Sequence, residues 1–330
     1  MLKKQIIFSG LQPTGKITLG NYLGAINNWR VLQYQYDCFF CIVDLHALTN
    51  YKSNNYLLNN IFYNIAFYIA SGLDCKKNII FQQSSINEHC ELAWILSCFC
   101  PIGWLNKMIQ FKNKIQNNKK NINLGLYSYP ILMAADILLY NTNIVPVGKD
   151  QKQHIELARD IAININKILN HKFFHIPKEY TNNVCNRIMS LQDVRNKMSK
   201  SDASDFSRIN VSDSKDLIKK KIRKAKTDNY LKITYDPVNR KEIANLIHIY
   251  CGLKNCSINS VLDNIQTLNT TKFKDILSDL IITKICPIHK KATEYLKNQF
   301  FIKKIINKGN EKAKLIAKLK INQLKNLLGL

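Results

Sequence analysis

Apolar residues in the first 191 positions form short runs, separated by longer segments whose apolar residues recur at helical spacing. The short runs predict buried strands over residues 6–8, 38–43, 78–83, 144–147 and 187–191. The longer segments predict helices over about 20–35, 56–72, 88–100, 101–111, 130–140 and 148–169, with a polar, lysine-rich loop at 112–124. Strands that alternate with helices are typical of a doubly wound parallel sheet, an α/β fold that binds ligands at the carboxyl ends of its strands.

The pattern changes after residue 191. From Ser212 onward only amphipathic helices follow, and Ser212-Asp213 has the composition of a helix N-cap. We therefore expect a first domain over 1–191 and an all-helical domain over 192–290. The last helices, at 291–330, either belong to the helical domain or pack back on the sheet.

Positive charge is concentrated in the helical part. The net charge is +25, and residues 212–330 hold 25 basic and 10 acidic side chains. A basic domain is typical of a protein that binds a polyanion such as nucleic acid. The abundance of Lys, Asn and Ile also fits an AT-rich gene, so we divide the excess between function and coding bias.

The cysteines indicate no disulfide framework and no metal site. A chain of this length needs no disulfides, although it has ten cysteines. Cys38 and Cys41 lie three apart on a predicted strand and so face opposite sides, which favours packed thiols over a redox or metal pair. Cys251, Cys256 and Cys286 lack zinc-ligand spacing. No signal peptide or long apolar span is recognisable, which predicts a cytoplasmic protein with no membrane segment.

Two stretches carry candidate chemistry. The first is the glycine-rich loop between the strand at 6–8 and the next helix, where Gly10, Gly15 and Gly20 allow close approach of a phosphate to a helix N-terminus. An ordinary strand-to-helix turn is the alternative. The second is the charged loop at 195–201, whose lysines can reach phosphates if the loop moves on binding. A solvated lysine loop is the alternative there.

These stretches resemble the two signatures of class I aminoacyl-tRNA synthetases. Lys197-Met-Ser-Lys200-Ser201 matches the second signature letter for letter, and Thr18-Leu-Gly-Asn21 stands where the first is usually His-Ile-Gly-His. Further matching segments are Pro13-Thr-Gly15, Met133-Ala-Ala-Asp-Ile-Leu-Leu-Tyr140 and Val145-Pro-Val-Gly-Lys-Asp-Gln-Lys-Gln-His-Ile-Glu156. Together they resemble the bacterial-type tryptophanyl-tRNA synthetases, densely over residues 6–202 and more weakly to the C-terminus. Thr18 and Asn21 replace both histidines of the general motif, a variant that is similar to this type of synthetase.

The resemblance implies a Rossmann-type catalytic domain with helices inserted at about 85–140, an anticodon-binding helical domain, and a homodimer formed through the insertion. It implies ATP as a substrate, Mg²⁺ with the ATP, and catalytic roles for Lys197, Lys200, Thr18 and Asn21. The implied ATP-binding residues are Gln12, Pro13, Thr14, Gly20, Asn21, Gly148, Lys149, Asp150, Ile188, Lys197, Met198, Ser199, Lys200 and Ser201. Lys149 departs from the family, in which an acidic residue often stands at this position.

Asp136 is the candidate that selects the amino acid. An unpaired carboxylate in an apolar helix is costly, and an ionised carboxylate complements the donor-only N–H of an indole. A carboxylate that bridges internally is the alternative. The resemblance implies that Asp136 binds tryptophan, with walls from Phe8, Met133, Val145 and Val147, amino-group contacts from Tyr129 and Gln151, and His46 at the pocket edge. Core packing is the alternative for each of these.

The implied function is therefore a tryptophan–tRNA ligase, with tryptophan, ATP and tRNA(Trp) as partners. A tyrosyl-tRNA synthetase shares the architecture but needs a phenol-binding Tyr and Asp pair where Met133 and Asp136 stand. A non-catalytic RNA-binding paralogue is expected to lose the charged loop at 195–201, called the lysine loop below. A small nucleotidyltransferase lacks the basic helical third. Trp29, Trp94 and Trp104 are expected in the core or an interface, and His154 and Glu156 on the surface. The lysines after Ser212 are expected to face tRNA or solvent. They include Lys220, Lys221 and Lys224.

Overall fold

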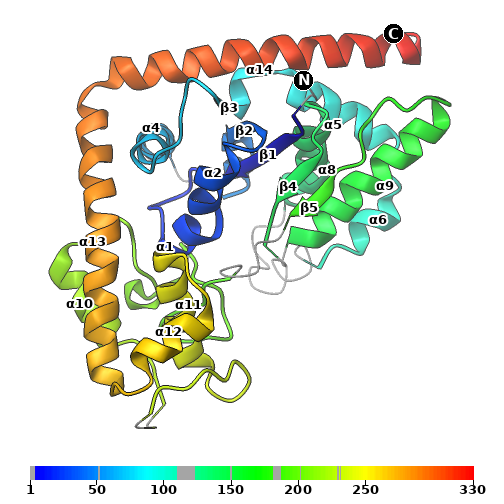
Figure 1. Ribbon diagram of the computed structural model, residues 1–330. Coiled ribbons are helices and arrows are strands. Elements are labelled where there is room, and N and C mark those ends of the chain that lie inside the picture. Colours follow the sequence, from blue (N-terminus) through cyan, green and yellow to red (C-terminus); the bar gives the residue numbers. More distant parts are fainter. Residues whose placement is uncertain are drawn as a thin grey trace.

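A five-stranded parallel sheet forms the centre of the computed structural model, which describes residues 4–50, 53–109, 123–148, 151–180, 187–200, 202–228, 230 and 232–330 (Figure 1). The strand order is β3-β2-β1-β4-β5, and each neighbouring pair runs parallel. The strands are β1 Ile6–Leu11, β2 Asp37–Ile42, β3 Ile79–Gln82, β4 Ile144–Pro146 and β5 Lys178–Tyr180. The predicted doubly wound α/β fold is confirmed. Since β1 lies between β2 and β4, the topological switch point is at the carboxyl end of β1.

Helices cover both faces of the sheet and continue into a helical region. The helices of the sheet part are α1 Leu19–Asn21, which continues through a π-helical turn at Tyr22–Ile26 into α2 Asn27–Leu32, then α3 Asp44–Ala47, α4 Asn54–Ala70, α5 Glu88–Cys98, α6 Ile102–Asn106, α8 Leu124–Leu138 and α9 Lys152–Ile168. The later helices are α10 Lys215–Arg223, α11 Lys241–Lys254, α12 Ile258–Ile265, α13 Thr270–Lys297 and α14 Gln299–Leu328.

Two hydrophobic cores lie on opposite faces of the sheet. On the face covered by α2 and α4, the fully buried Trp29 stacks on Phe40 with ring centroids 4.8 Å apart. On the other face, residues of α5, α8 and α9 pack against β1 and β2. Cys38 belongs to the first core and Cys41 to the second, as the period of a strand requires. Both thiols are buried, which confirms the prediction of packed cysteines at these positions.

The C-terminal helix closes one edge of the sheet. In Figure 1, α13 rises along the left side of the molecule, past α10, and α14 runs across the top. A Cβ atom on Gly309 of α14 would lie 1.8 Å from the carbonyl oxygen of Ile80, so only glycine permits this approach to β3. The next residue, Asn310, accepts a hydrogen bond from the backbone N–H of Gln82 at 2.9 Å. Helix α14 thereby covers the edge strand β3.

The structure corrects several predicted boundaries. The strand next to β4, at the edge opposite β3, is β5 at Lys178–Tyr180, and residues 187–191 are not a strand of the sheet. Ile188 and Leu191 are instead buried in the first core, and the N–H of Met189 donates to Asn245 Oδ1 at 2.8 Å. Helix α8 begins at Leu124 rather than Pro130, because Asn123 caps it by accepting from the N–H of Leu126. Ser214, rather than Ser212-Asp213, caps α10.

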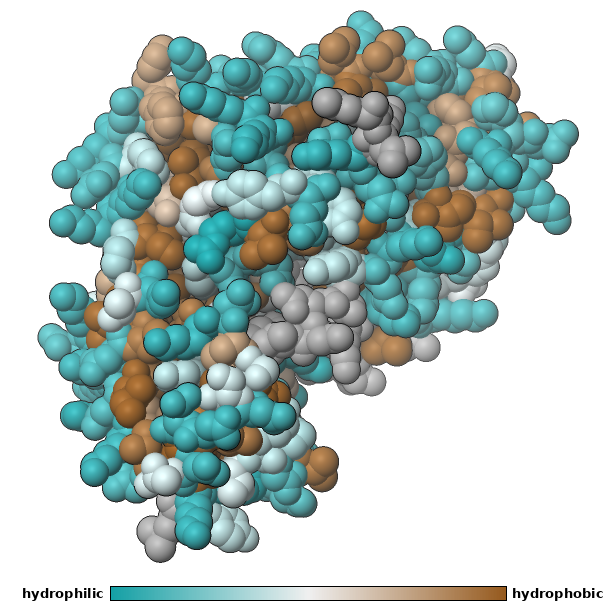
Figure 2. Space-filling view, viewed as in Figure 1, coloured by the Kyte–Doolittle hydropathy of each residue, from teal (hydrophilic) through white to brown (hydrophobic). Residues whose placement is uncertain are grey.

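Hydrophilic side chains cover most of the face drawn in Figure 2. Trp29 is in the core as predicted, Trp104 is half-buried, and Trp94 is 73% exposed. Among the described residues, no helix combines the length and the apolar character that crossing a membrane requires.

Candidate active site

The first signature begins the helix that follows β1. Thr18 is the N-cap of α1, where its Oγ1 accepts from the N–H of Asn21 at 3.2 Å and its own N–H donates to Asn21 Oδ1 at 3.1 Å. Because a backbone N–H only donates, the atom of Asn21 that faces it must be the oxygen, and the Nδ2 group is the end that can donate to a ligand. The buried Thr18 therefore shapes the turn while Asn21, which is half-buried, can contact a phosphate.

The signature turn is also tied to the segment that follows the lysine loop. The N–H of Leu19 donates to the carbonyl of Ile209 at 2.8 Å, and the N–H of Val211 donates to the carbonyl of Ile17 at 2.9 Å. These bonds place the start of α1 between the sheet and the helical region (Figure 1).

The second signature lies against the first loop. The Lys200 Nζ donates to the backbone carbonyl of Gln12 at 3.3 Å. Its side chain passes Gly15, whose φ of +73° is a left-handed conformation that favours glycine. Burial lowers the pKa of Lys200 to about 8. The two stretches predicted to bind ATP are thus brought together, although 188 positions separate Lys200 from Gln12.

The rest of the lysine loop is held by residues 188–190. The N–H of Met198 donates to the carbonyl of Ile188 at 3.0 Å, and the N–H of Ser190 to the carbonyl of Asn196 at 2.9 Å. Met198 is buried near Gly20, whereas Lys197 is exposed. Of the other predicted ATP-binding residues, Pro13 is buried, and Gln12, Thr14, Gly148 and Ser199 are half-buried. Lys149, Asp150 and Ser201 lie outside the described residues.

Asp136 lies in α8 at the centre of a buried polar cluster. Its Oδ2 is 2.8 Å from His46 Nε2, and its Oδ1 is 2.6 Å from His89 Nδ1 and 2.7 Å from Gln83 Nε2. Desolvation opposes ionisation, but the hydrogen bonds and charges of His46 and His89 outweigh it and lower the pKa of Asp136 to about 2. The internal bridge left open by the sequence is therefore present.

The cluster still leaves the carboxylate one acceptor position. An ionised carboxylate offers about four lone-pair sites. The described contacts take two on Oδ1 and one on Oδ2, so the remaining site is on Oδ2, beside His46. An internal bridge and a hydrogen bond to a ligand are thus compatible at Asp136.

The predicted tryptophan walls divide into core and half-buried residues. Phe8 and Val145 are buried, and Phe8 stacks on Tyr140 with ring centroids 5.9 Å apart. Met133 and Val147 are half-buried, as are Tyr129 and Gln151. The ring of Tyr129 lies 6.3 Å from that of His46, which joins this residue to the Asp136 cluster.

One surface assignment was wrong. His154 is 1% exposed, and its Nε2 lies 2.9 Å from the hydroxyl of Tyr129, because the first turn of α9 packs against α8. Glu156, on the outer side of α9, is exposed as predicted.

The sequence interpretation missed Gln83, His89 and Tyr140. Gln83 follows β3 at the carboxyl edge of the sheet, and its Oε1 also accepts from the N–H of Leu45 at 3.1 Å. His89 lies in α5, and its Nε2 is 2.8 Å from the Tyr140 hydroxyl. The available signal was a histidine in one apolar helix and a tyrosine at the end of another apolar segment, two residues after α8.

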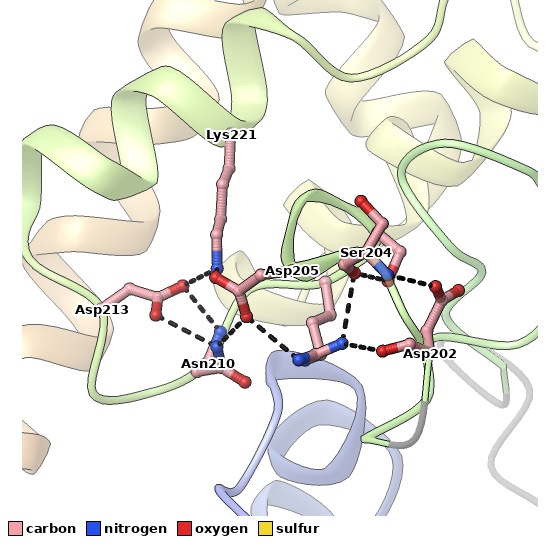
Figure 3. Close-up of polar contacts among 8 residues, drawn as sticks. Asp202, Ser204, Asp205, Asn210, Asp213 and Lys221 are labelled. Atoms are coloured by element: carbon pink, nitrogen blue, oxygen red, sulfur yellow. Dashed lines mark hydrogen bonds and ion pairs between the residues drawn. The ribbon is translucent and has the colours of Figure 1, made fainter.

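Lys221 was also misassigned as a surface lysine. It is fully buried on the inner side of α10, with its Nζ 2.6 Å from Asp213 Oδ2 and 2.7 Å from Asp205 Oδ2 (Figure 3). Asn210 donates through its Nδ2 to both carboxylates at 3.1 Å. Lys220 and Lys224 are exposed, as predicted.

Comparison with known proteins gives concordant matches over the chain. Residues 2–285 match the family described as tRNA synthetases class I (W and Y). The chain is 48% identical to the tryptophan–tRNA ligase of Rickettsia conorii over 326 residues, which cover 99% of each chain. It is 45% identical to that of Prochlorococcus marinus over 333 residues, covering 100% of this chain and 98% of the relative.

Two solved structures resemble this one over nearly all of their length. The tryptophanyl-tRNA synthetase of Mycoplasma pneumoniae superposes with a TM-score of 0.92 at 32% identity, covering 100% of this chain and 98% of its own. That of Campylobacter jejuni, in complex with ADP and tryptophan, gives a TM-score of 0.81 at 33% identity, covering 99% and 100%.

Proposed function

The chain belongs to the class I tRNA synthetases for tryptophan and tyrosine, and we propose that within this family it is a tryptophan–tRNA ligase. A carboxylate oxygen of tryptophan attacks the α-phosphorus of ATP, the bond to pyrophosphate breaks, and tryptophanyl-adenylate forms. A ribose hydroxyl at the 3′ end of tRNA(Trp) then attacks the acyl carbon, and AMP leaves. The reaction uses ATP and tRNA, so we assign the enzyme to the cytoplasm.

The observation that carries the choice of tryptophan is the Asp136 carboxylate. It is held as an anion by His46, His89 and Gln83 and has one acceptor position left on Oδ2. An indole N–H needs such an acceptor, whereas a phenol hydroxyl both donates and accepts. Met133, Val147, Phe8 and Val145 supply the apolar surroundings, and Tyr129 and Gln151 bind the amino group.

ATP binds where the two signature loops meet. The ammonium group of Lys200 donates to the Gln12 carbonyl and can donate another hydrogen bond to a phosphate that binds beside it. The Nδ2 group of Asn21 and the backbone near Gly20 contact the phosphates, as do Lys197 and Ser201. Positioned positive charge stabilises pyrophosphate as negative charge develops on it, with no proton transfer from the lysines. Mg²⁺ enters bound to the phosphates and neutralises part of their charge.

The homodimer forms through the helices between β3 and β4. Trp94 of α5, Ile102 of α6 and Leu124 of α8 are 73%, 69% and 77% exposed. Helix α8 packs against both α5 and α6, so these large apolar side chains belong to one packed unit. Large apolar side chains left exposed on one packed unit support an interface there, because a contiguous apolar patch marks protein–protein contact sites. Replacement of Trp94 by Glu should therefore convert a dimer to a monomer in light scattering.

Exchange between pyrophosphate and ATP, measured with each of the twenty amino acids, tests the function. We expect exchange with tryptophan alone, because a pocket built for one hydrogen-bond donor rejects substrates that lack it by about 10⁴-fold. Exchange with tyrosine alone would assign the chain to the sister enzyme. A complete lack of exchange would indicate a non-catalytic paralogue.

A further inference from the structure

His89 contacts Oδ1 of Asp136, the carboxylate oxygen opposite the one proposed to accept from the indole N–H. It is fully buried in α5, next to β3, and its ring lies 5.9 Å from that of Phe81. His46, on the other oxygen, lies instead beside Tyr129. Asp136 is therefore held between one histidine on the core side and one on the side of the proposed ligand.

The two ring nitrogens of His89 have different partners. An ionised carboxylate cannot donate, so Nδ1 of His89 must donate to Asp136 Oδ1. Nε2, at the other side of the ring, lies 2.8 Å from the Tyr140 hydroxyl, which can donate or accept and therefore forms this hydrogen bond whether or not Nε2 carries a hydrogen. Tyr140 is 1% exposed and stacks on Phe39 with ring centroids 4.8 Å apart, so the aromatic core fixes its hydroxyl.

His89 and Gln83 together saturate Oδ1 and leave Oδ2 for the ligand. Without His89, Gln83 alone would hold Oδ1 and His46 alone Oδ2. The carboxylate would then have more freedom about its χ2 torsion, and its open lone pair would be less well aimed. A hydrogen bond to a charged group depends steeply on its angle and distance.

We propose that His89 is a positioning residue for amino-acid specificity: backed by Tyr140, it orients the Asp136 carboxylate so that the open lone pair of Oδ2 meets the indole N–H. The inference rests on the proposed function and deepens it. His89 itself touches neither substrate nor ATP, and it acts through Asp136.

The experiment compares two substrates that differ in one group. Tryptophan and 3-benzothienylalanine have nearly the same shape, but sulfur replaces the N–H in the second. The ratio of their kcat/KM values in ATP–pyrophosphate exchange measures the preference for the N–H. A residue that only maintains the shape of the pocket would weaken both substrates equally and leave this ratio unchanged.

Two replacements of His89 separate its two nitrogens. In His89→Asn the amide Nδ2 stands near the position of Nδ1 and can still donate to Asp136. In His89→Gln the amide stands near the position of Nε2, which keeps the Tyr140 contact and removes the donor to Asp136. We expect His89→Gln to lower the preference about tenfold and His89→Asn to keep it within about threefold of wild type. Equal preferences in the two variants would overturn the proposal.

Two further variants keep the test decisive. Tyr140→Phe removes a single oxygen atom, so it tests the same support if the His89 variants fail to fold, and it should lower the preference about threefold. A wild-type ratio in Tyr140→Phe and in every folded His89 variant would contradict the positioning role. Asp136→Ala should abolish the preference. If Asp136→Ala keeps it, the proposed tryptophan pocket itself is wrong, whatever the His89 variants show.

Discussion

The ammonium group of Lys200 lies 3.3 Å from the backbone carbonyl oxygen of Gln12, which joins the two signature loops of the chain. Loss of this cation should affect the chemical step more than tryptophan binding, because pyrophosphate gains charge as it leaves. We expect Lys200→Ala to lower the single-turnover rate of adenylate formation by about 10²–10³-fold. A normal rate with only a raised KM for tryptophan would contradict this role.

The lowered pKa of Lys200 predicts a pH dependence. In the free enzyme its pKa is about 8, so the ammonium form that attracts phosphate is lost as the pH rises through this value. The kcat/KM for ATP should therefore fall above about pH 8. Bound ATP favours the charged lysine, so the corresponding fall in kcat should occur at higher pH. The measurement is the exchange rate between pH 6.5 and 9.5, at limiting and at saturating ATP.

The pKa of Asp136 predicts a loss of stability in acid. Folding lowers this pKa from 3.8 to about 2. A carboxyl with a lower pKa in the folded chain stabilises the fold above its unfolded pKa and loses that contribution as the pH falls from about 4 to 2, here about 2 kcal/mol. Asp136→Asn cannot titrate. The difference in the free energy of unfolding between wild type and this variant, measured with urea, should therefore shrink as the pH falls over that range. A constant difference would contradict the lowered pKa of Asp136.

Lys221 is expected to matter for stability rather than for tRNA. Its removal leaves the carboxylates of Asp213 and Asp205 without their cation, and Asp213 is itself buried. Breaking a buried pair on one side costs about 3–5 kcal/mol, so Lys221→Ala should lower the free energy of unfolding by that amount. The exposed Lys220, one position away, is the control, and Lys220→Ala should change it by less than about 0.5 kcal/mol. Equal effects would show that the ion pairs contribute nothing.

Gly309→Ala should separate α14 from β3. The added Cβ would lie 1.8 Å from the Ile80 carbonyl oxygen, and backbone at that distance cannot move aside without shifting the helix. Overpacking of this kind costs about 1–3 kcal/mol or more. Gly24 is the matched control, since a Cβ there meets nothing within 4 Å. Gly24→Ala should leave thermal stability unchanged or raise it slightly.

The parts of the site that could be predicted from the sequence are charged residues in unusual surroundings. Asp136 in an apolar helix and the lysine loop are of this kind. The partners of Asp136 were not predictable in the same way, because His89 and Gln83 reach it only through tertiary packing, from α5 and from the segment that follows β3. No local pattern encodes which inward histidine meets which carboxylate.

The errors in the fold have a similar origin. The edge strand Lys178–Tyr180 is short and polar, with two exposed residues, and gives no apolar run. The apolar run at 187–191 is buried against the helical region rather than in the sheet, so its hydrophobicity was identified correctly and its partner was not. Lys221 has the composition of a surface lysine, and only the position of Asp213 and Asp205 makes it a core residue.

The charging of tRNA tests the central claim most directly. The purified protein is incubated with ATP, Mg²⁺, unfractionated tRNA and an equimolar mixture of the twenty amino acids, and the amino acid esterified to tRNA is identified by mass spectrometry. The account predicts tryptophan, attached to the tRNA that carries the tryptophan anticodon. Esterified tyrosine, or tRNA that carries no amino acid while a control synthetase in the same mixture is active, would contradict it.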